Sequence, residues 1–143
     1  MKTPFDIILL DVIMPMLNGI DTAKEIRQEV DFSVTVELDE LSVDEIQFSS
    51  IISNAIDNAL NAQAELPVGS RQITLMIKDS EGKLLFSVKN PYKDAPVFAN
   101  GPPITDEKNH GYGTKSICYI TEKLGGKCQF AIQNELFVLR VIL

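Results

Sequence analysis

Two asparagines spaced one helical turn apart are the residues of this chain whose types and spacing could do chemistry. Asn54 and Asn58 lie in residues 50–62 (SIISNAIDNALNA), where most other residues are isoleucine, leucine or alanine. Positions i and i+4 share one face of an α-helix, so the two carboxamides would lie side by side. Carboxamides at the edge of an apolar helix need polar partners, which a metal ion with phosphate oxygens can supply. The alternative is that both are surface residues of an ordinary amphipathic helix.

A glycine-containing turn later in the chain opens a second amphipathic segment. Residues 110–113 (HGYG) precede apolar residues at helical spacing. Glycine lets backbone N–H groups approach phosphate, and a helix amino terminus carries partial positive charge. Lys108 and Lys115 flank the turn and could neutralise phosphate charge, or they could be ordinary surface lysines. A P-loop is excluded, because that motif needs glycine directly before Lys115, where this chain has Thr114.

The long helix that carries the asparagines is predicted from its capping pattern and its apolar stripe. Residues 42–45 (SVDE) form an S-x-x-E capping box, so a helix is expected to start near Val43. Pro67 and Gly69 are expected to end it. The residues predicted to face the core recur at helical spacing: Phe48, Ile51, Ile52, Ala55, Ile56, Ala59 and Leu60.

The remaining periodicity predicts a sheet and one further helix. Alternating apolar residues predict strands over 32–38, 71–79, 83–90, 127–133 and 136–143. Helical spacing returns over 113–124, where Gly125-Gly126 would cap the helix. Residues 91–109 contain four prolines and no sustained periodicity, which is typical of a long functional or mobile loop. The order β-α-β-β-loop-α-β-β predicts an α+β fold, a two-layer α/β sandwich whose mixed, mostly antiparallel sheet has helices on one face.

Taken together, the asparagine-bearing helix and the late glycine turn resemble the N box and the last glycine box of the GHKL ATPases, which share the Bergerat ATP-binding fold. Within that superfamily, residues 31–143 are similar to the catalytic, ATP-binding domain of sensor histidine kinases. The resemblance implies ATP and Mg²⁺ as cofactors, with Asn58 as a Mg²⁺ ligand. His110, the only histidine, is interpreted as a loop residue and not as a phosphoacceptor. The resemblance implies these nucleotide-binding residues: Asn54, Asn58, Asn90, Lys108, Gly111, Gly113, Thr114 and Lys115.

The first glycine box of the family is altered in this chain. Family members usually carry Asp-x-Gly-x-Gly there, and the aspartate binds the adenine amino group, whereas residues 89–92 are Lys-Asn-Pro-Tyr. The side-chain oxygen of Asn90 can still accept a hydrogen bond from adenine N6, but it is neutral. A similar asparagine occurs in the branch of histidine kinases that respond to peptide pheromones, and the chain resembles that branch.

The first residues resemble a different family, the receiver domains of response regulators. Within residues 5–21, Asp11 lies where the phosphorylated aspartate of a receiver would be. The fragment, predicted over residues 1–30, lacks the acidic pair, the Thr/Ser and the lysine of a complete receiver, so Asp11 is expected to be structural. Its apolar strand, residues 5–12, would have to add to a sheet edge, which predicts a possible homodimer through this strand.

Composition limits the partners and the location. The chain has 143 residues and a net charge of −7 without a basic cluster, which argues against nucleic-acid binding. No apolar run approaches the ~20 residues needed to cross a bilayer, and the first residues do not form a signal peptide. Cys118 and Cys128 lack metal-binding spacing and are expected to be reduced, buried thiols of a cytoplasmic protein.

Two functions remain open from the sequence. The first is an ATP/Mg²⁺-binding domain of histidine-kinase type in two-component signalling. Because no phosphoacceptor helix pair is present in the sequence, it would transfer phosphate only in trans, to a histidine phosphoacceptor domain or a response regulator. The second is a non-catalytic interaction module, or degenerate kinase remnant, that binds a two-component partner. Receiver-type signalling through Asp11 is disfavoured.

Overall fold

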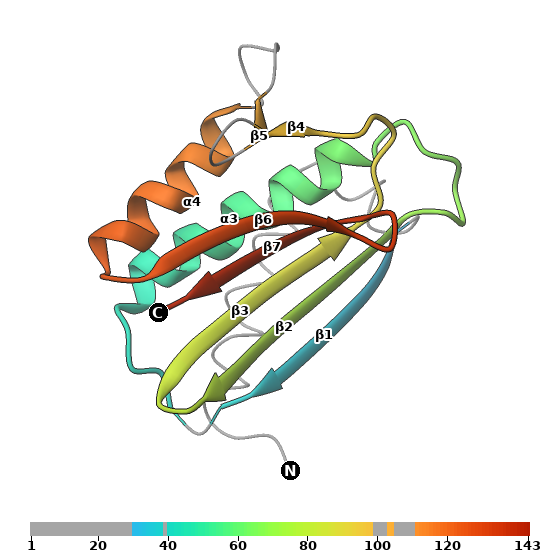
Figure 1. Ribbon diagram of the computed structural model, residues 1–143. Coiled ribbons are helices and arrows are strands. Elements are labelled where there is room, and N and C mark those ends of the chain that lie inside the picture. The colour runs from blue at the N-terminus through green and yellow to red at the C-terminus, as the bar shows by residue number, and fades with distance from the viewer. Residues whose placement is uncertain (1–29, 39, 99–102, 105–110) are drawn as a thin grey trace.

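The computed structural model describes residues 30–38, 40–98, 103–104 and 111–143 (Figure 1). The receiver-like fragment, apart from Val30, lies outside the described residues, and so do Lys108 and His110. The elements in chain order are β1 (Asp31–Glu37), α3 (Glu45–Ala62), β2 (Gln72–Ser80), β3 (Lys83–Asn90), β4 (Val97–Phe98), β5 (Pro103–Ile104), α4 (Gly111–Lys123), β6 (Lys127–Gln133) and β7 (Leu136–Ile142).

Strands from both halves of the described chain form one five-stranded sheet in the order β1-β2-β3-β7-β6. β1 pairs with β2 in parallel, and the other pairings are antiparallel. A parallel pair requires a crossover connection, which α3 provides between β1 and β2. Both α3 and α4 lie on the same face of the sheet (Figure 1). The predicted α+β sandwich with a mixed, mostly antiparallel sheet is therefore confirmed.

The core lies between α3 and the central strands. Every residue that was predicted to face the core from α3 is buried. Phe48 of α3 packs edge-to-face on Phe86 of β3, with the ring centroids 5.8 Å apart. Burying one large apolar side chain stabilises a fold by about 1.5–3 kcal/mol. The apolar stripe therefore fixes both the position of α3 on the sheet and its rotation about its own axis.

The long helix is shorter than predicted at both ends. Its N-cap is Asp44, whose side chain accepts a backbone N–H of the first turn at 2.9 Å, so the helix begins at Glu45 and not near Val43. Val43 packs against the core from just outside the helix, the position that a hydrophobic staple uses. The helix ends at Ala62, well before Pro67.

A buried glutamine explains where α3 ends. Gln63 is fully buried, and its Nε2 donates to the carbonyl oxygen of Ala59 at 3.0 Å. Its Oε1 accepts the backbone N–H of Gln72, at the start of β2, at 2.8 Å. The guanidinium of Arg71 donates to two carbonyl oxygens of the turn after the helix, each at 2.8 Å. Carbonyls at a helix end lack intrahelical donors, and Gln63 supplies one to Ala59, while Arg71 holds the turn that follows.

Tight turns join β2 to β3 and β6 to β7. Glu81 and Gly82 both have positive φ, and so do Asn134 and Glu135. Two positive φ values in a two-residue turn match the right-handed twist of a hairpin. The predicted loop over 91–109 differs from expectation, because β4 and β5 pair there as short antiparallel strands.

The carboxyl end of α4 is closed by two glycines, as predicted. The N–H groups of Gly125 and Gly126 donate to the carbonyl oxygens of Glu122 and Thr121, each at 2.9 Å, which is a Schellman motif. Gly125 has a φ of +79°, a conformation that glycine adopts without steric cost. A Cβ at Gly126 would lie 2.2 Å from the carbonyl oxygen of Ile142, so this position has no room for a side chain.

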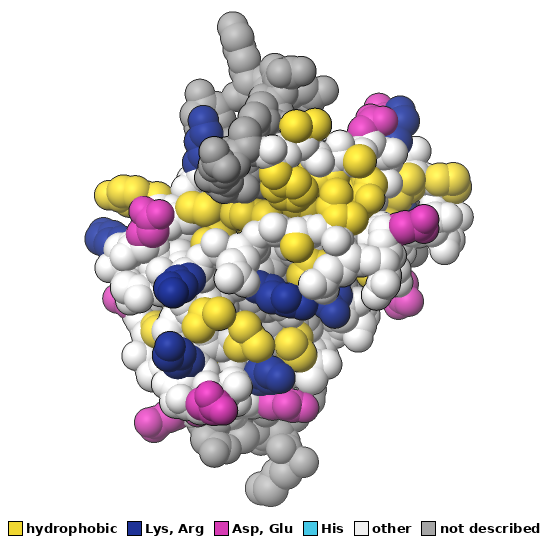
Figure 2. Space-filling view, in the orientation of Figure 1, with side chains coloured by type: hydrophobic (Ala, Val, Ile, Leu, Met, Phe, Trp, Pro, Cys, Tyr) yellow, Lys and Arg dark blue, Asp and Glu magenta, His cyan; other side chains and the backbone are white. Residues whose placement is uncertain are grey.

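The sheet face opposite the helices mixes basic and apolar side chains (Figure 2). Strand alternation places Lys89 of β3 and Arg140 of β7 on this face, because their neighbours Val88 and Leu139 belong to the core. In the described part of the chain, no helix has both the length and the apolar content to cross a bilayer.

The contacts of Gln63 predict a loss of stability on substitution. Gln63→Leu keeps most of the volume but leaves the Gln72 N–H without its acceptor. The free energy of unfolding should therefore fall by about 1–3 kcal/mol in urea unfolding followed by circular dichroism. Asn61→Ala, which changes an exposed amide on the same helix, should alter it by less than about 0.5 kcal/mol. Equal effects of the two substitutions would contradict the role of Gln63.

The close approach at Gly126 predicts a second loss of stability. Gly126→Ala forces a Cβ against the Ile142 backbone, and overpacking of this kind costs about 1–3 kcal/mol. Gly113→Ala, at the other end of α4, is the matched control, since its Cβ would have no neighbour nearer than 3.7 Å. Chemical unfolding of both variants measures the difference. If Gly126→Ala were as stable as the control, the packing against β7 would be wrong.

Candidate functional site

The two segments that the sequence singled out are in contact. α4 packs against α3, and a Cβ at Gly113 would lie 3.7 Å from the backbone carbonyl oxygen of Asn54. The next residue, Thr114, is 1% exposed. The first turn of α4 therefore lies against the middle of α3, close to the predicted asparagine pair.

The glycine pair lies inside α4 and not in a turn before it. α4 begins at Gly111, so Gly111 and Gly113 both belong to its first turn, whereas the sequence predicted a helix only from residue 113. The first four N–H groups of an α-helix have no intrahelical acceptor. Gly111 and Gly113 therefore still present backbone N–H donors at the amino end of the helix, where an anion is favoured.

Hydrogen bonding distinguishes the two asparagines of α3. Asn54 Nδ2 donates to the carbonyl oxygen of Ser50, one turn earlier, at 2.9 Å. Asn58 is half-buried, and within the described ranges its carboxamide has no hydrogen-bond partner. Among the described residues, its carboxamide is therefore open to water or to a ligand that approaches from solvent. Burial raises the pKa of the neighbouring Asp57 carboxyl above its ordinary value.

Asn90 lies at the end of β3, on the same sheet face as the core residues Phe86 and Val88. The residue is 1% exposed, and its Nδ2 donates to the carbonyl oxygen of Pro91 at 2.8 Å. No donor in the described part of the chain reaches its Oδ1. Leaving a buried acceptor unpaired costs about 1–3 kcal/mol, which an N–H group of a ligand would recover.

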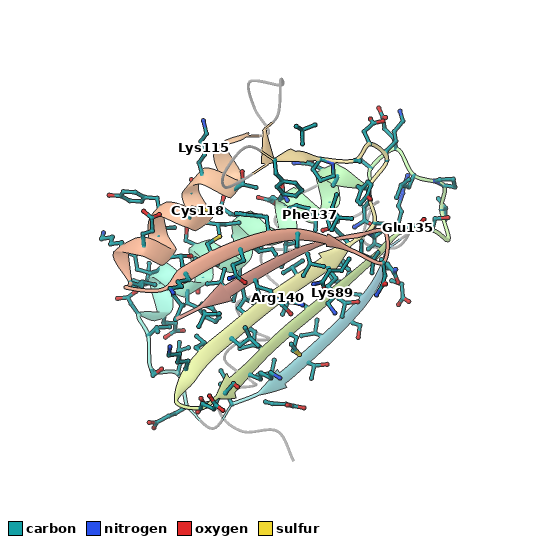
Figure 3. All side chains as sticks on the ribbon, viewed as in Figure 1. Lys89, Lys115, Cys118, Glu135, Phe137 and Arg140 are labelled. Atoms are coloured by element: carbon teal, nitrogen blue, oxygen red, sulfur yellow. The ribbon has the colours of Figure 1, made fainter. Side chains whose placement is uncertain are left out.

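An aromatic cluster beside Asn90 was not predicted from the sequence. Phe137 of β7 is the strand-register partner of Asn90. Its ring stacks on Phe98 of β4, with centroids 6.3 Å apart, and on Phe130 of β6, at 6.0 Å (Figure 3 labels Phe137). The cluster holds β4 over the end of the sheet. Each phenylalanine occupies an ordinary apolar position in its own segment, so no local signal could have revealed their meeting.

The segment that follows Asn90 is tied to the carboxyl end of α3. The backbone N–H of Lys93 donates to the carbonyl oxygen of Ala62 at 3.3 Å, and the Lys93 ammonium forms an ion pair with Glu65. The ion pair is exposed and adds little stability. The backbone bond caps the last turn of the helix that carries Asn58.

The two predicted lysines are not part of this contact among the described residues. Lys115 is exposed on α4 (Figure 3). Lys108 lies outside the described residues. The structure thus brings Asn54, Gly113 and Thr114 together at the contact of α3 with α4, and it places Asn90 at the end of β3.

Asp57 gives a prediction that is independent of any ligand. Because its pKa is raised on folding, the folded state holds the proton at pH values where the unfolded state has lost it, and stability falls as the pH rises through this window. Asp57→Asn should therefore raise the free energy of unfolding at pH 7. The gain should be below about 1 kcal/mol, since solvent screens the group. Urea unfolding below the ordinary pKa of aspartate should show no gain, and a gain that persists there would contradict the assignment.

Sequence comparison identifies the family of this chain. Residues 43–143 match a family model described as GHKL domain. The sensor histidine kinase CitA of Klebsiella pneumoniae is 27% identical over an alignment of 123 positions that covers 80% of this chain. The chain spans 22% of the length of that relative.

Solved structures share the fold. The catalytic domain of histidine kinase ThkA, in a nucleotide-free form, has a TM-score of 0.72 at 21% identity, covering 94% of this chain and 92% of that chain. The mycobacterial sensor histidine kinase MprB has a TM-score of 0.68 at 16% identity, covering 94% and 93%. ThkA in complex with the response regulator protein TrrA has a TM-score of 0.63 at 20% identity, covering 94% and 40%. Since the family model covers well over half of its residues, this chain belongs to the GHKL domain family and has the fold of histidine kinase catalytic domains.

Proposed function

We propose that this chain is the ATP-binding catalytic domain of a sensor histidine kinase in a two-component system. The observation that carries the proposal is the buried Oδ1 of Asn90, which has no donor among the described residues. The amino group of adenine is a donor of the required kind. The finer assignment, to the branch that responds to peptide pheromones, rests on this asparagine in place of the usual aspartate.

The phosphates of ATP would lie between α3 and the first turn of α4. The backbone N–H groups of Gly111 and Gly113 would donate to them, and Asn54 borders the same contact. Lys108, Thr114 and Lys115 are the further proposed contacts, and the exposed Lys115 would act through its charge. The proximity of Gly113 to Asn54 supports this arrangement.

Asn58 is the residue proposed to bind Mg²⁺. Within the described residues, no group of three His, Cys, Asp or Glu side chains could hold a metal ion. That composition fits Mg²⁺, which keeps several waters and takes most of its remaining ligands from the phosphates of a nucleotide. The carboxamide oxygen of Asn58 is a suitable additional ligand, since no described residue engages it. Bound Mg-ATP would supply the phosphoryl group that is transferred.

The acceptor would be a histidine phosphoacceptor domain, or a response regulator, that acts in trans. The complex of ThkA with the response regulator TrrA supports a partner of that class. Because ATP and Mg²⁺ are cytoplasmic cofactors, the domain would work in the cytoplasm.

A non-catalytic interaction module is the second candidate function. It is favoured by the neutral side chain of Asn90, where the family usually has aspartate. A neutral acceptor gives a weaker hydrogen bond than the charge-assisted one that aspartate makes. Nucleotide binding would then be weak or absent, and the chain would act by binding a two-component partner.

A thermal-shift assay with a Mg-ATP analogue tests the proposal. A ligand at 100 times its dissociation constant stabilises a fold by ~2.7 kcal/mol, so the melting temperature should rise clearly. Asn58→Ala should lose most of this shift by removing the proposed Mg²⁺ ligand. Asn90→Leu should also lose it while the fold is retained, because an apolar group replaces a half-satisfied carboxamide.

Gln129→Ala, an exposed amide on β6 away from α3, is the matched control and should keep the full shift. The absence of a shift in the unmodified chain at millimolar nucleotide would favour the interaction module. An unchanged shift in both Asn58→Ala and Asn90→Leu would show that nucleotide binds elsewhere.

A further inference from the structure

Two cysteines far apart in the sequence lie side by side in the fold. The Sγ atoms of Cys118 in α4 and Cys128 in β6 are 3.3 Å apart and share a hydrogen bond. Both thiols are free and half-buried, so the prediction of buried cysteines is correct only in part. Their meeting is a tertiary contact that their sequence spacing did not indicate.

Regular structure on both sides holds the pair together. Cys128 is the register partner of the core residue Val141, so it lies on the sheet face that the helices cover. Cys118 follows the fully buried Ile117 on α4, which itself packs on β6. A disulfide has an S–S length of about 2.05 Å, so the sulfur atoms need to approach by only about 1 Å, which side-chain torsions can provide.

We propose that Cys118 and Cys128 form a reversible intrachain disulfide in the presence of hydrogen peroxide, covalently joining α4 to β6. The Cys118 thiolate attacks one peroxide oxygen, which gives a sulfenic acid and hydroxide. The Cys128 thiol then attacks the sulfenic sulfur, so the S–S bond forms and the S–O bond breaks. The two thiols lose two protons and two electrons in total, and the peroxide is reduced to two molecules of water. A dithiol reductant reverses the reaction.

The order of attack follows from the surroundings of the two thiols. Burial raises the pKa of both, and the rise is far larger for Cys128. At Cys118, the hydrogen bond with Cys128 partly opposes this rise, while the carboxylate of Glu122 adds to it. These surroundings favour Cys118 as the attacking thiol. Because both thiols are mostly protonated at neutral pH, the reaction is slow compared with that of a dedicated peroxidase.

The disulfide would restrain the helix whose first turn lies against Asn54. It would fix the second half of α4 to the edge strand of the sheet. Neither the chemistry nor its detection requires a bound nucleotide, so this inference does not rest on the proposed function.

The test treats the whole chain with hydrogen peroxide, then alkylates it and determines its mass. The expected product is a monomer lighter by two hydrogen atoms, in which neither cysteine is alkylated. Proteolysis should yield a peptide pair that links Cys118 to Cys128, and dithiothreitol should restore both thiols. The oxidised chain should melt about 5 °C or more above the reduced chain, because the cross-link constrains the unfolded state.

Cys118→Ser and Cys128→Ser are the controls. Each retains one thiol, which should gain oxygen atoms on oxidation, and neither variant should show the rise in melting temperature. The proposal is overturned if both thiols of the unmodified chain remain open to alkylation after peroxide. Cysteines that carry two or three oxygens without a cross-link, or disulfide-linked dimers, would overturn it as well. These readings on the unmodified chain decide the question even if a serine variant fails to fold.

Discussion

The packing of α3 on the sheet is the constraint on which the candidate site depends. A helix has 3.6 residues per turn, so fixing its apolar stripe against the strands also fixes the direction of every other side chain. Once Ile52 and Ile56 face the core, Asn54 lies on another face of the helix, and its backbone carbonyl is near Gly113 of α4. α4 approaches closely there, since a Cβ at Gly113 would lie in ordinary contact, 3.7 Å from the backbone carbonyl oxygen of Asn54. Burial of apolar surface, and not a polar contact, therefore orients the candidate site.

Three carboxamides illustrate how burial separates structural roles from a binding role. Gln63 uses both its donor and its acceptor within the protein. Asn90 uses its donor only, and Asn58 uses neither, as far as the described residues extend. An apolar residue would cost less than a half-satisfied carboxamide at a buried position, so stability does not account for Asn90. The proposed adenine contact would complete its hydrogen bonding.

Local periodicity predicts most of this fold, because it records which face of an element is buried. The strands of the main sheet and the core stripe of α3 are correct for this reason. The start of α3 was misplaced, since the local pattern did not show that Asp44 would cap the helix. The meetings of Phe98 with Phe137 and of Cys118 with Cys128 depend on tertiary pairing between distant segments, which periodicity does not record. The contact between α3 and α4 was expected only because the two motifs resemble a known pair.

The restraints on α4 differ along its length, and the difference has a functional consequence. Its carboxyl end is fixed by the Schellman motif and by the close packing of Gly126 on β7. Its middle is anchored by Ile117 in the core. The N–H groups of its first turn have no carbonyl acceptor within the helix, so this turn makes fewer intrahelical hydrogen bonds than the rest. A phosphate bound at the first turn would supply the missing acceptors without disturbing the anchored part of the helix. The same helix thus combines a firm attachment to the sheet with an end that a ligand can complete.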